Sequence, residues 1–392
     1  MNKNLYTYIL LLSSLIGTSF SIAAGITFGD VFCLLLMLQA VPKLLKKKWR
    51  MDFFFKVSFT YVIMMLLSAT LNGTLTNTIF INFIRIAFDG CLVYLCLRNT
   101  LKTEEDVKLF IKIMLIFPLF FAVKLKQILE STFNPDVLSI HEVEFDNGRN
   151  GFGFTALLYL LFVLLAYYKN FLNRLPSLII CTFLLGCIYF SVSRAAILLA
   201  LITIVMYVIT VELKRISTYQ VVIYLALLLF IPIILHMLSS YISLGVLESG
   251  QELLESKMED TGSDFIDIRI YFINIIPIKE SFRQFSLLQT LFGDGLTVRH
   301  SFIAHSLIVT GLIGFIVFCY SILVPMFHYW RKGFLGKSFV YVMALMLYND
   351  FLTNARYIIH ENTMLYMIIC AIFVSLINIS NYEVILFNRV HK

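Results

Sequence analysis

The sequence predicts an all-α polytopic integral membrane protein with about 12 transmembrane helices. Three observations predict this class. Of the 392 residues, 59% are hydrophobic and only 14% are charged. The apolar residues form long stretches that recur along the whole chain. Most of these stretches approach the ~20 residues that cross the hydrocarbon core as a helix, which satisfies its own backbone hydrogen bonds in lipid.

The predicted spans extend from residue 5 to residue 379. They cover residues 5–24, 26–41, 53–71, 79–97, 109–125, 151–168, 177–192, 195–211, 220–240, 302–327, 338–350 and 363–379. The first stretch is too long for a signal peptide, lacks a small-residue cleavage site and is followed at once by more apolar sequence, so we expect a retained span. We expect residues 1–392 to form a single transmembrane helical domain.

Basic residues near the ends of the spans predict the orientation, because lysine and arginine favour the cytoplasmic side. The basic clusters at 43–50, 98–108, 169–174, 212–215 and 331–337 fall on one side if both termini are cytoplasmic. The net charge of +7 is therefore a signal of topology, and we expect no nucleic-acid partner. The seven cysteines lie in apolar spans without metal-ligand spacing, which favours small buried hydrophobic residues.

Two outer segments are long enough to carry function, at about 126–150 and at 241–301 between spans 9 and 10. Within the second, residues 267–291 have the spacing of apolar residues that predicts one or two helices on the outer membrane surface. We expect a bend at Pro277 and a stop at Gly293 and Gly295.

Some arginines fall on the predicted outer side, where the topology rule does not expect positive charge. Their presence there needs another explanation. Arg85 lies inside the fourth predicted span, four residues before Asp89, so the two can pair on one helix face. An ionisable residue at this depth indicates a functional site, although a structural ion pair is the alternative. Arg194 lies between two spans, where it could also reach the interface as a snorkelling side chain. Arg149 precedes the sixth span, where it could be an ordinary turn residue.

These outer arginines together suggest a pocket for a phosphate-bearing ligand, since guanidinium binds phosphate oxygens in bidentate fashion. The set comprises Arg85, Arg149, Arg194, Arg269, Arg283, Arg299 and Arg356.

His300 is the candidate acid or base, because it opens the tenth span at the predicted outer surface. A neutral imidazole there can accept a proton from a hydroxyl. His305 lies deeper along the same helix and is the weaker candidate. Arg356 and His360 form a reserve pair in the last outer loop. The outer loops have no pair of carboxylates with metal-ligand spacing, so we expect no metal and no cofactor.

The stretch "LFGDGLTVRHSFIAHSLIVTGLIGF" resembles the signature of the O-antigen polymerase (Wzy) and O-antigen ligase superfamily. That signature is a Gly-x-Gly, a His-Asn that opens a helix, and a Gly-Leu-Ile-Gly eleven residues after the histidine. The corresponding residues here are Gly293, Gly295, His300, Gly311 and Gly314. We expect Gly311 and Gly314 to permit close packing between helices.

Further motifs add to the resemblance. "SVSRAA" is similar to a Ser-Arg between two spans, at Ser193 and Arg194, and "GRNGFG" resembles an Arg-x-x-Gly before a span, at Arg149. Arg269 corresponds to the arginine of the long outer loop, although Arg283 lies nearer to the Gly-x-Gly. Ser301 stands where the family usually has asparagine.

The resemblance implies a GT-C-like glycosyltransferase of the bacterial inner membrane, with residues 241–301 as its large periplasmic loop. It joins oligosaccharide repeat units carried on undecaprenyl diphosphate, with lipid-linked donor and acceptor as substrates. Arg194 and Arg269, or Arg283 in place of Arg269, would bind the diphosphate, and Arg85 and Arg149 would assist or position the second substrate. His300 would orient or deprotonate the acceptor hydroxyl. Membrane lipid, a chain-length regulator and a flippase of the same pathway are the implied partners.

Two alternatives stay open. A ligase that transfers the glycan to lipid A core would share these motifs and differ in its acceptor. A flippase for lipid-linked oligosaccharide would also have many spans, but transporters commonly show internal repeats and charges along helices at mid-membrane depth. The single pair of charges within a span and the long outer loop favour an enzyme.

Overall fold

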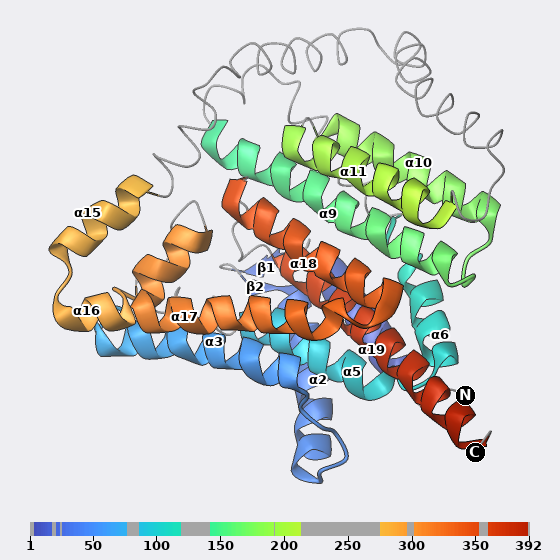
Figure 1. Ribbon diagram of the computed structural model, residues 1–392. Helices are drawn as coiled ribbons and strands as arrows, with labels where there is room; N and C mark the ends of the chain where they lie inside the picture. The colour runs from blue at the N-terminus through green and yellow to red at the C-terminus, as the bar shows by residue number, and fades with distance from the viewer. Residues whose placement is uncertain are drawn as a thin grey trace, which may run out of the picture. The chain divides into compact units, whose positions relative to one another are not determined.

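A computed structural model describes most of the chain. The described residues are 4–17, 21–23, 26–76, 86–118, 142–191, 193–212, 275–295, 302–352 and 360–390. They are predominantly helical, which confirms the predicted helical class, with one short antiparallel pair of strands, β1 (Ser21–Ala23) and β2 (Ile26–Thr27). Figure 1 shows the helices and this strand pair.

The chain divides into two compact units. The first comprises residues 1–117 and 267–392, and the second comprises residues 118–266. The helices of the first unit are α1 (Leu5–Gly17), α2 (Phe28–Leu45), α3 (Phe53–Leu71), η1 (Ile86–Leu92), α5 (Val93–Thr100), α6 (Glu104–Met114), α15 (Ile276–Gln284), α16 (Leu287–Phe292), α17 (Phe302–Trp330), α18 (Gly333–Leu352) and α19 (His360–Val390). The second unit contains α9 (Glu142–Tyr168), α10 (Arg174–Phe190), α11 (Arg194–Tyr207) and η2 (Val208–Glu212).

The described helices include three that are long and apolar enough to cross a membrane: Phe28–Leu45, Phe53–Leu71 and Ser306–Trp330. Six further apolar helical stretches, some of them parts of longer helices, are shorter. Helix α2 exposes large apolar side chains, with Leu38 61% and Leu45 78% exposed. Such a surface is unfavourable in water and favourable in lipid. The chain is therefore a helical membrane protein, while about 12 spans and the orientation of the termini stay predictions.

The N-terminal segment differs from the expected span over residues 5–24. Helix α1 has 13 residues and ends at Gly17, so it is ~20 Å long at ~1.5 Å per residue and is shorter than the ~30 Å hydrocarbon core. A Cβ atom on Gly17 would lie 2.6 Å from the backbone nitrogen of Gly29. The end of α1 therefore lies directly against the start of α2, and the strand pair β1 and β2 connects the two helices.

The first unit is held together by helices that are distant in sequence. Helix α3 packs along α17, and α19 packs against α5 and η1, as Figure 1 shows for α3 and α17. At one end of α3, the Asp52 carboxylate accepts hydrogen bonds from the backbone N–H of Phe55 at 3.0 Å and from the Tyr94 hydroxyl at 2.8 Å. Arg98 forms an ion pair with Asp52 at 3.1 Å and donates to the Ser375 hydroxyl at 2.9 Å. This network joins α3, α5 and α19.

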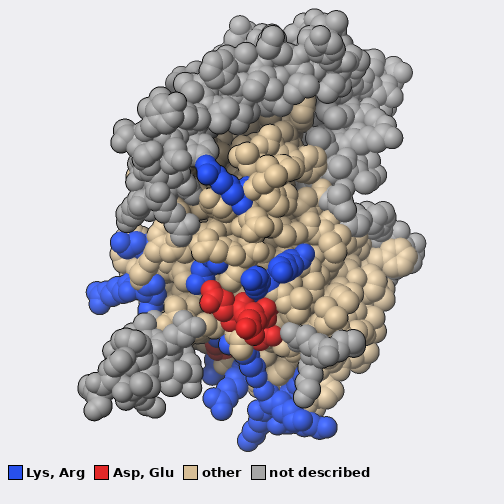
Figure 2. All heavy atoms as spheres, turned by 90° about the vertical axis from the view of Figure 1, so that its right-hand side faces the viewer, with Lys and Arg blue, Asp and Glu red and all other residues tan. Residues whose placement is uncertain are grey.

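Charged side chains gather outside the apolar helices. The basic segment from Lys46 to Lys48, directly after α2, is exposed. Helix α6 begins with Glu104, Glu105 and Asp106. Figure 2 shows lysine and arginine side chains gathered mainly over the lower part of one face, around a small group of acidic side chains.

Several local predictions are corrected by the backbone. Residues 86–92, which include Asp89, form a π-helix, and Arg85 lies outside the described residues, so the pairing of Arg85 with Asp89 stays a prediction. Arg149 lies within α9, not in a turn before it. Pro277 stands in the first turn of α15, where its missing N–H costs nothing, so the bend comes later, between α15 and α16. Helices are confirmed at Ile276–Gln284 and Leu287–Phe292, as is the stop at Gly293; residues 267–274 lie outside the described residues, and the location on the outer membrane surface stays a prediction.

Candidate functional site

The Gly-Asp-Gly turn of residues 293–295 docks into a break in α17. Helix α16 ends at Gly293, which has a left-handed φ of 80°, and α17 is interrupted at Gly311, with a φ of 65°. Figure 1 shows the two parts of α17 running in different directions. The predicted span over residues 302–327 is therefore two helical segments.

Hydrogen bonds explain how this break is tolerated. In a continuous α-helix, the carbonyls of Ile308 and Val309 would accept from residues four positions later, beyond the break. Here the backbone N–H of Asp294 donates to the Ile308 oxygen at 2.8 Å, and that of Gly295 donates to the Val309 oxygen at 3.2 Å. The turn thus satisfies carbonyls that would be costly to leave unpaired at membrane depth.

The glycines are required because backbone meets backbone. A Cβ atom on Gly293 would collide with the Val309 carbonyl, and one on Gly311 would collide with the Gly293 nitrogen. Both positions also have positive φ, which disfavours other residues. The close packing predicted at Gly311 is present, against the backbone of Leu291 and Gly293; in addition, Gly311 breaks α17 and so admits the turn. A Cβ atom on Gly314 would instead meet the side chain of Thr310, across the same break.

In the second unit, the structure brings together the segments that carry Arg149 and Arg194. A Cβ atom on Gly153 of α9 would collide with the Ser191 hydroxyl and lie 3.1 Å from the Ala196 Cβ. Arg149 lies four residues before Gly153, about one helical turn. Arg194 is the first residue of α11, so the connection to α10 is very short, as predicted.

Two buried serines shape the connection between α10 and α11. Ser191 is fully buried and donates to the Ile188 carbonyl at 2.6 Å. Ser193 is 2% exposed and caps α11 by accepting from the backbone N–H of Ala196 at 3.4 Å. A serine at this position satisfies one of the free amides at the start of a helix. The Ser-Arg motif is thus a helix start that holds the backbone of Arg194 in place.

The other predicted site residues are not brought together by the described part of the chain. Arg283 is exposed on α15. His300, Arg269 and Arg85 lie outside the described residues, as do Ser301, Arg299 and Arg356. His305 lies on α17 and His360 begins α19.

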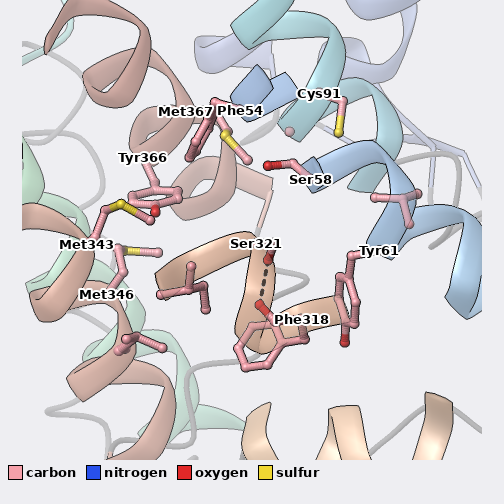
Figure 3. Close-up of a pocket in the computed structure, with 14 residues that line it drawn as sticks. Phe54, Ser58, Tyr61, Cys91, Phe318, Ser321, Met343, Met346, Tyr366 and Met367 are labelled. Atoms are coloured by element: carbon pink, nitrogen blue, oxygen red, sulfur yellow. Dashed lines mark hydrogen bonds between the residues drawn. The ribbon is translucent and has the colours of Figure 1, made fainter. Parts of the chain in front are cut away.

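A cavity in the first unit was not predicted from the sequence. It is lined from α3, η1, α17, α18 and α19, and its side chains include Phe54, Tyr61, Phe318, Met343, Met346 and Met367. Figure 3 shows these side chains converging on it from several helices, with Ser58 and Ser321 as polar members of the lining. The Ser321 hydroxyl is occupied by a hydrogen bond to the Phe318 carbonyl at 2.7 Å.

The chemistry of this cavity suits a hydrocarbon chain. Its middle residues on α17 lie near the centre of the apolar segment Ser306–Trp330, and methionine side chains adapt their shape to an apolar guest. The sequence carried one weak signal: Met343 and Met346 are three residues apart and share a face of α18.

Metal binding was not expected from the sequence. Within the described ranges, His, Cys, Asp and Glu side chains form no group of three or more that could hold a metal ion. The reaction without a metal therefore stays a prediction. The described cysteines are free, and most are buried in the helices.

The fold and these sites define a class, a helical membrane protein with a broken helix, paired arginine-bearing segments and an apolar cavity. Nothing matches the chain in comparisons with protein-family models, with curated proteins and with solved structures.

Proposed function

We propose that the protein is a surface-polysaccharide polymerase that joins undecaprenyl-diphosphate-linked oligosaccharide repeat units at the periplasmic face of the bacterial inner membrane. The observation that carries the proposal is the meeting of the Arg149 and Arg194 segments at Gly153. Two permanent cations on neighbouring segments suit a diphosphate group. The docked Gly-Asp-Gly turn adds support, because it gives a physical reason for each glycine of the motif on which the resemblance rests.

The reaction that we propose is a glycosyl transfer without a metal. A hydroxyl oxygen of the acceptor glycan attacks the anomeric carbon of the donor, and a new carbon–oxygen bond forms. The bond from that carbon to the diphosphate oxygen breaks, and undecaprenyl diphosphate leaves with the electron pair. His300 takes the hydroxyl proton, and arginines, with Arg194 and Arg269 foremost, stabilise the charge that develops on the leaving group.

The cavity between α3, α17, α18 and α19 gives the hydrocarbon part of the substrate a place to bind. A mostly apolar lining disfavours water, and the cavity of about 40 Å³ would have to widen, through movement of its methionine side chains, to accept part of a polyprenyl chain. A diphosphate headgroup would have no cationic partner among the side chains that line it. We therefore assign only the polyprenyl tail of the substrate to this cavity.

Substitutions in the gene at its own locus test the residue roles. We expect His300→Ala and Arg269→Ala to abolish polysaccharide polymers at unchanged protein level. His328→Ala, an exposed histidine at the other end of α17, serves as the matched control. Arg283→Ala tests the alternative loop arginine against Lys279→Ala on the same exposed helix. If both His300→Ala and Arg269→Ala produce polymers of normal length, the roles proposed for His300 and Arg269 are wrong.

The ligase alternative differs only in the acceptor, and deletion of the gene distinguishes the two. A polymerase deletion leaves a single repeat unit on the lipid A core, as seen on a gel. A ligase deletion leaves the core without glycan and lets lipid-linked polymer accumulate.

The break in α17 favours a second candidate function, a flippase for lipid-linked oligosaccharide. Discontinuous membrane helices commonly form the substrate sites of transporters. The purified protein in vesicles distinguishes this from glycosyl transfer: a flippase moves labelled lipid-linked oligosaccharide across the bilayer without lengthening it, whereas a polymerase lengthens it.

A further inference from the structure

The C-terminal end of α3 carries polar side chains that bind backbone oxygens more than 200 residues away in the chain. Ser68 donates to the Val309 carbonyl. The Asn72 side-chain amide donates to the Gly293 carbonyl at 2.8 Å. The Thr74 hydroxyl lies 3.2 Å from the Asp294 carbonyl and 3.3 Å from the Ala69 carbonyl of α3, and its single hydrogen is donated to one of them at a time.

These contacts connect α3 to both parts of the broken-helix site. The Val309 oxygen accepts from Ser68 and also from the backbone N–H of Gly295. Asn72 donates to the Ser68 carbonyl at 2.9 Å as well as to Gly293, so both of its amide hydrogens are used. Most buried hydroxyl groups have such a partner, and the fully buried Ser68 follows this rule.

The turn also contacts the backbone of α3 directly. A Cβ atom on Gly295 would lie 2.5 Å from the Ala69 Cα and 2.5 Å from the Thr74 hydroxyl oxygen. Only a glycine therefore fits at position 295 against this surface of α3. The position of the turn depends on the α3 side chains that surround it. Neighbouring Thr70 differs: it is exposed, and its hydroxyl donates to the Leu66 carbonyl of its own helix.

We infer that Ser68, Asn72 and Thr74 are positioning residues, which hold the Gly-Asp-Gly turn against the break in α17 in the geometry that polymerisation requires. None of the three belongs to the motifs that suggested the function. The inference rests on the proposed function, because Gly295 leads the chain toward His300, five residues later. The three side chains act through the turn and have no role in the chemistry itself.

Thr74 offers the sharpest test because two substitutions of Thr74 can be compared with a control substitution at Thr70. Thr74→Val keeps the shape and removes the hydroxyl, Thr74→Ser keeps the hydroxyl, and Thr70→Ala is the matched control on the same helix end. With full-length purified protein and lipid-linked repeat unit, we expect Thr74→Val to lower kcat about tenfold, since small displacements of reacting groups are costly. The KM for the lipid-linked donor should stay within about twofold, because the turn is not assigned to donor binding.

Two results would overturn the inference. One is a Thr74→Val protein as active as Thr70→Ala. The other is equal loss in Thr74→Val and Thr74→Ser, because the hydroxyl would then have no part in the effect. Asn72→Ala should repeat the loss of kcat, and its thermal midpoint in detergent should be measured so that an unfolded protein is recognised.

A cross-link tests the docking independently of activity. Cysteines at Asn72 and Asp294 should form a disulfide under mild oxidation, whereas cysteines at Thr70 and Asp294 should not. A missing cross-link at Asn72, with protein that is folded, would refute the contact and the inference with it. If the cysteine variant cross-links but the wild-type protein, which keeps Asn72 and Asp294, never lengthens glycans, the proposed function is overturned, and the positioning role falls with it.

Discussion

Gly311 and Gly293 meet backbone to backbone: the space that a Cβ atom on Gly311 would fill is occupied by the Gly293 nitrogen and by Leu291. The two glycines belong to different helices, and each is in the left-handed region. The helix break and the turn that fills it are therefore one structural unit. Neither would be stable without the other, because the turn provides the donors that the broken helix lacks.

Gly311→Ala should destabilise the protein more than Gly73→Ala does. Both glycines have positive φ, but a Cβ atom on Gly73 would meet nothing within 4 Å. Both substitutions therefore place alanine at positive φ, which costs ~1–2 kcal/mol, and Gly311→Ala adds ~1–3 kcal/mol for overpacking. Thermal unfolding of the detergent-solubilised variants measures the difference. Equal midpoints for the two variants would mean that the close approach contributes nothing.

Gly153→Ala should disturb the arginine-bearing segments of the second unit. The new methyl group would press on Ser191 and Ala196, at a cost of ~1–3 kcal/mol, and would displace the start of α11. We expect polymer formation to fall together with the thermal midpoint. Gly186→Ala is the control, since a Cβ atom there meets nothing within 4 Å and alanine favours the helix by ~0.5–1 kcal/mol. A Gly153→Ala protein that behaves like Gly186→Ala would contradict the packing described for α9.

Asp52 should contribute to stability in two separable ways. Asp52→Ala removes the cap of α3 and the partner of Arg98, and we expect a loss of ~2–3 kcal/mol. Asp52→Asn keeps an oxygen for the Phe55 amide but loses the charge, so we expect ~1–2 kcal/mol. Thr103→Ala, which removes the cap of α6 alone, should cost ~1 kcal/mol. The ion pair would be irrelevant if Asp52→Asn unfolded at the wild-type temperature.

Filling the cavity should displace a bound lipid tail. Ser321 is 9% exposed and lines the cavity, whereas Leu323, two residues later on α17, is 47% exposed. We expect Ser321→Phe, and to a smaller extent Ser321→Leu, to reduce the polyprenyl lipid that copurifies, measured by native mass spectrometry. Leu323→Phe should leave it unchanged. If Ser321→Phe retains as much polyprenyl lipid as Leu323→Phe, the tail binds elsewhere.

Much of the helical framework follows from local sequence. The span predicted at 53–71 coincides with α3, because a continuous apolar stretch follows Asp52, a residue that caps a helix. Other ends were missed for physical reasons. Helix α1 stops at Gly17, where the backbone of Gly29 approaches, and this contact depends on residues far outside any local pattern. The π-helix at 86–92 was likewise not predicted, because the apolar residues around it are equally compatible with an α-helix.

The sequence by itself determined the class of protein, through long apolar stretches, and it singled out the glycines and arginines that a helix in lipid does not ordinarily need. Only the tertiary structure decided what these residues do. It showed that Gly311 breaks a helix, that Gly293 and Gly295 fill the break, that α3 holds them, and that Gly153 brings Arg149 toward Arg194 in the chain path. The reason is that hydrophobicity and helix signals act between near neighbours, whereas the partner of an unpaired carbonyl can come from any part of the chain.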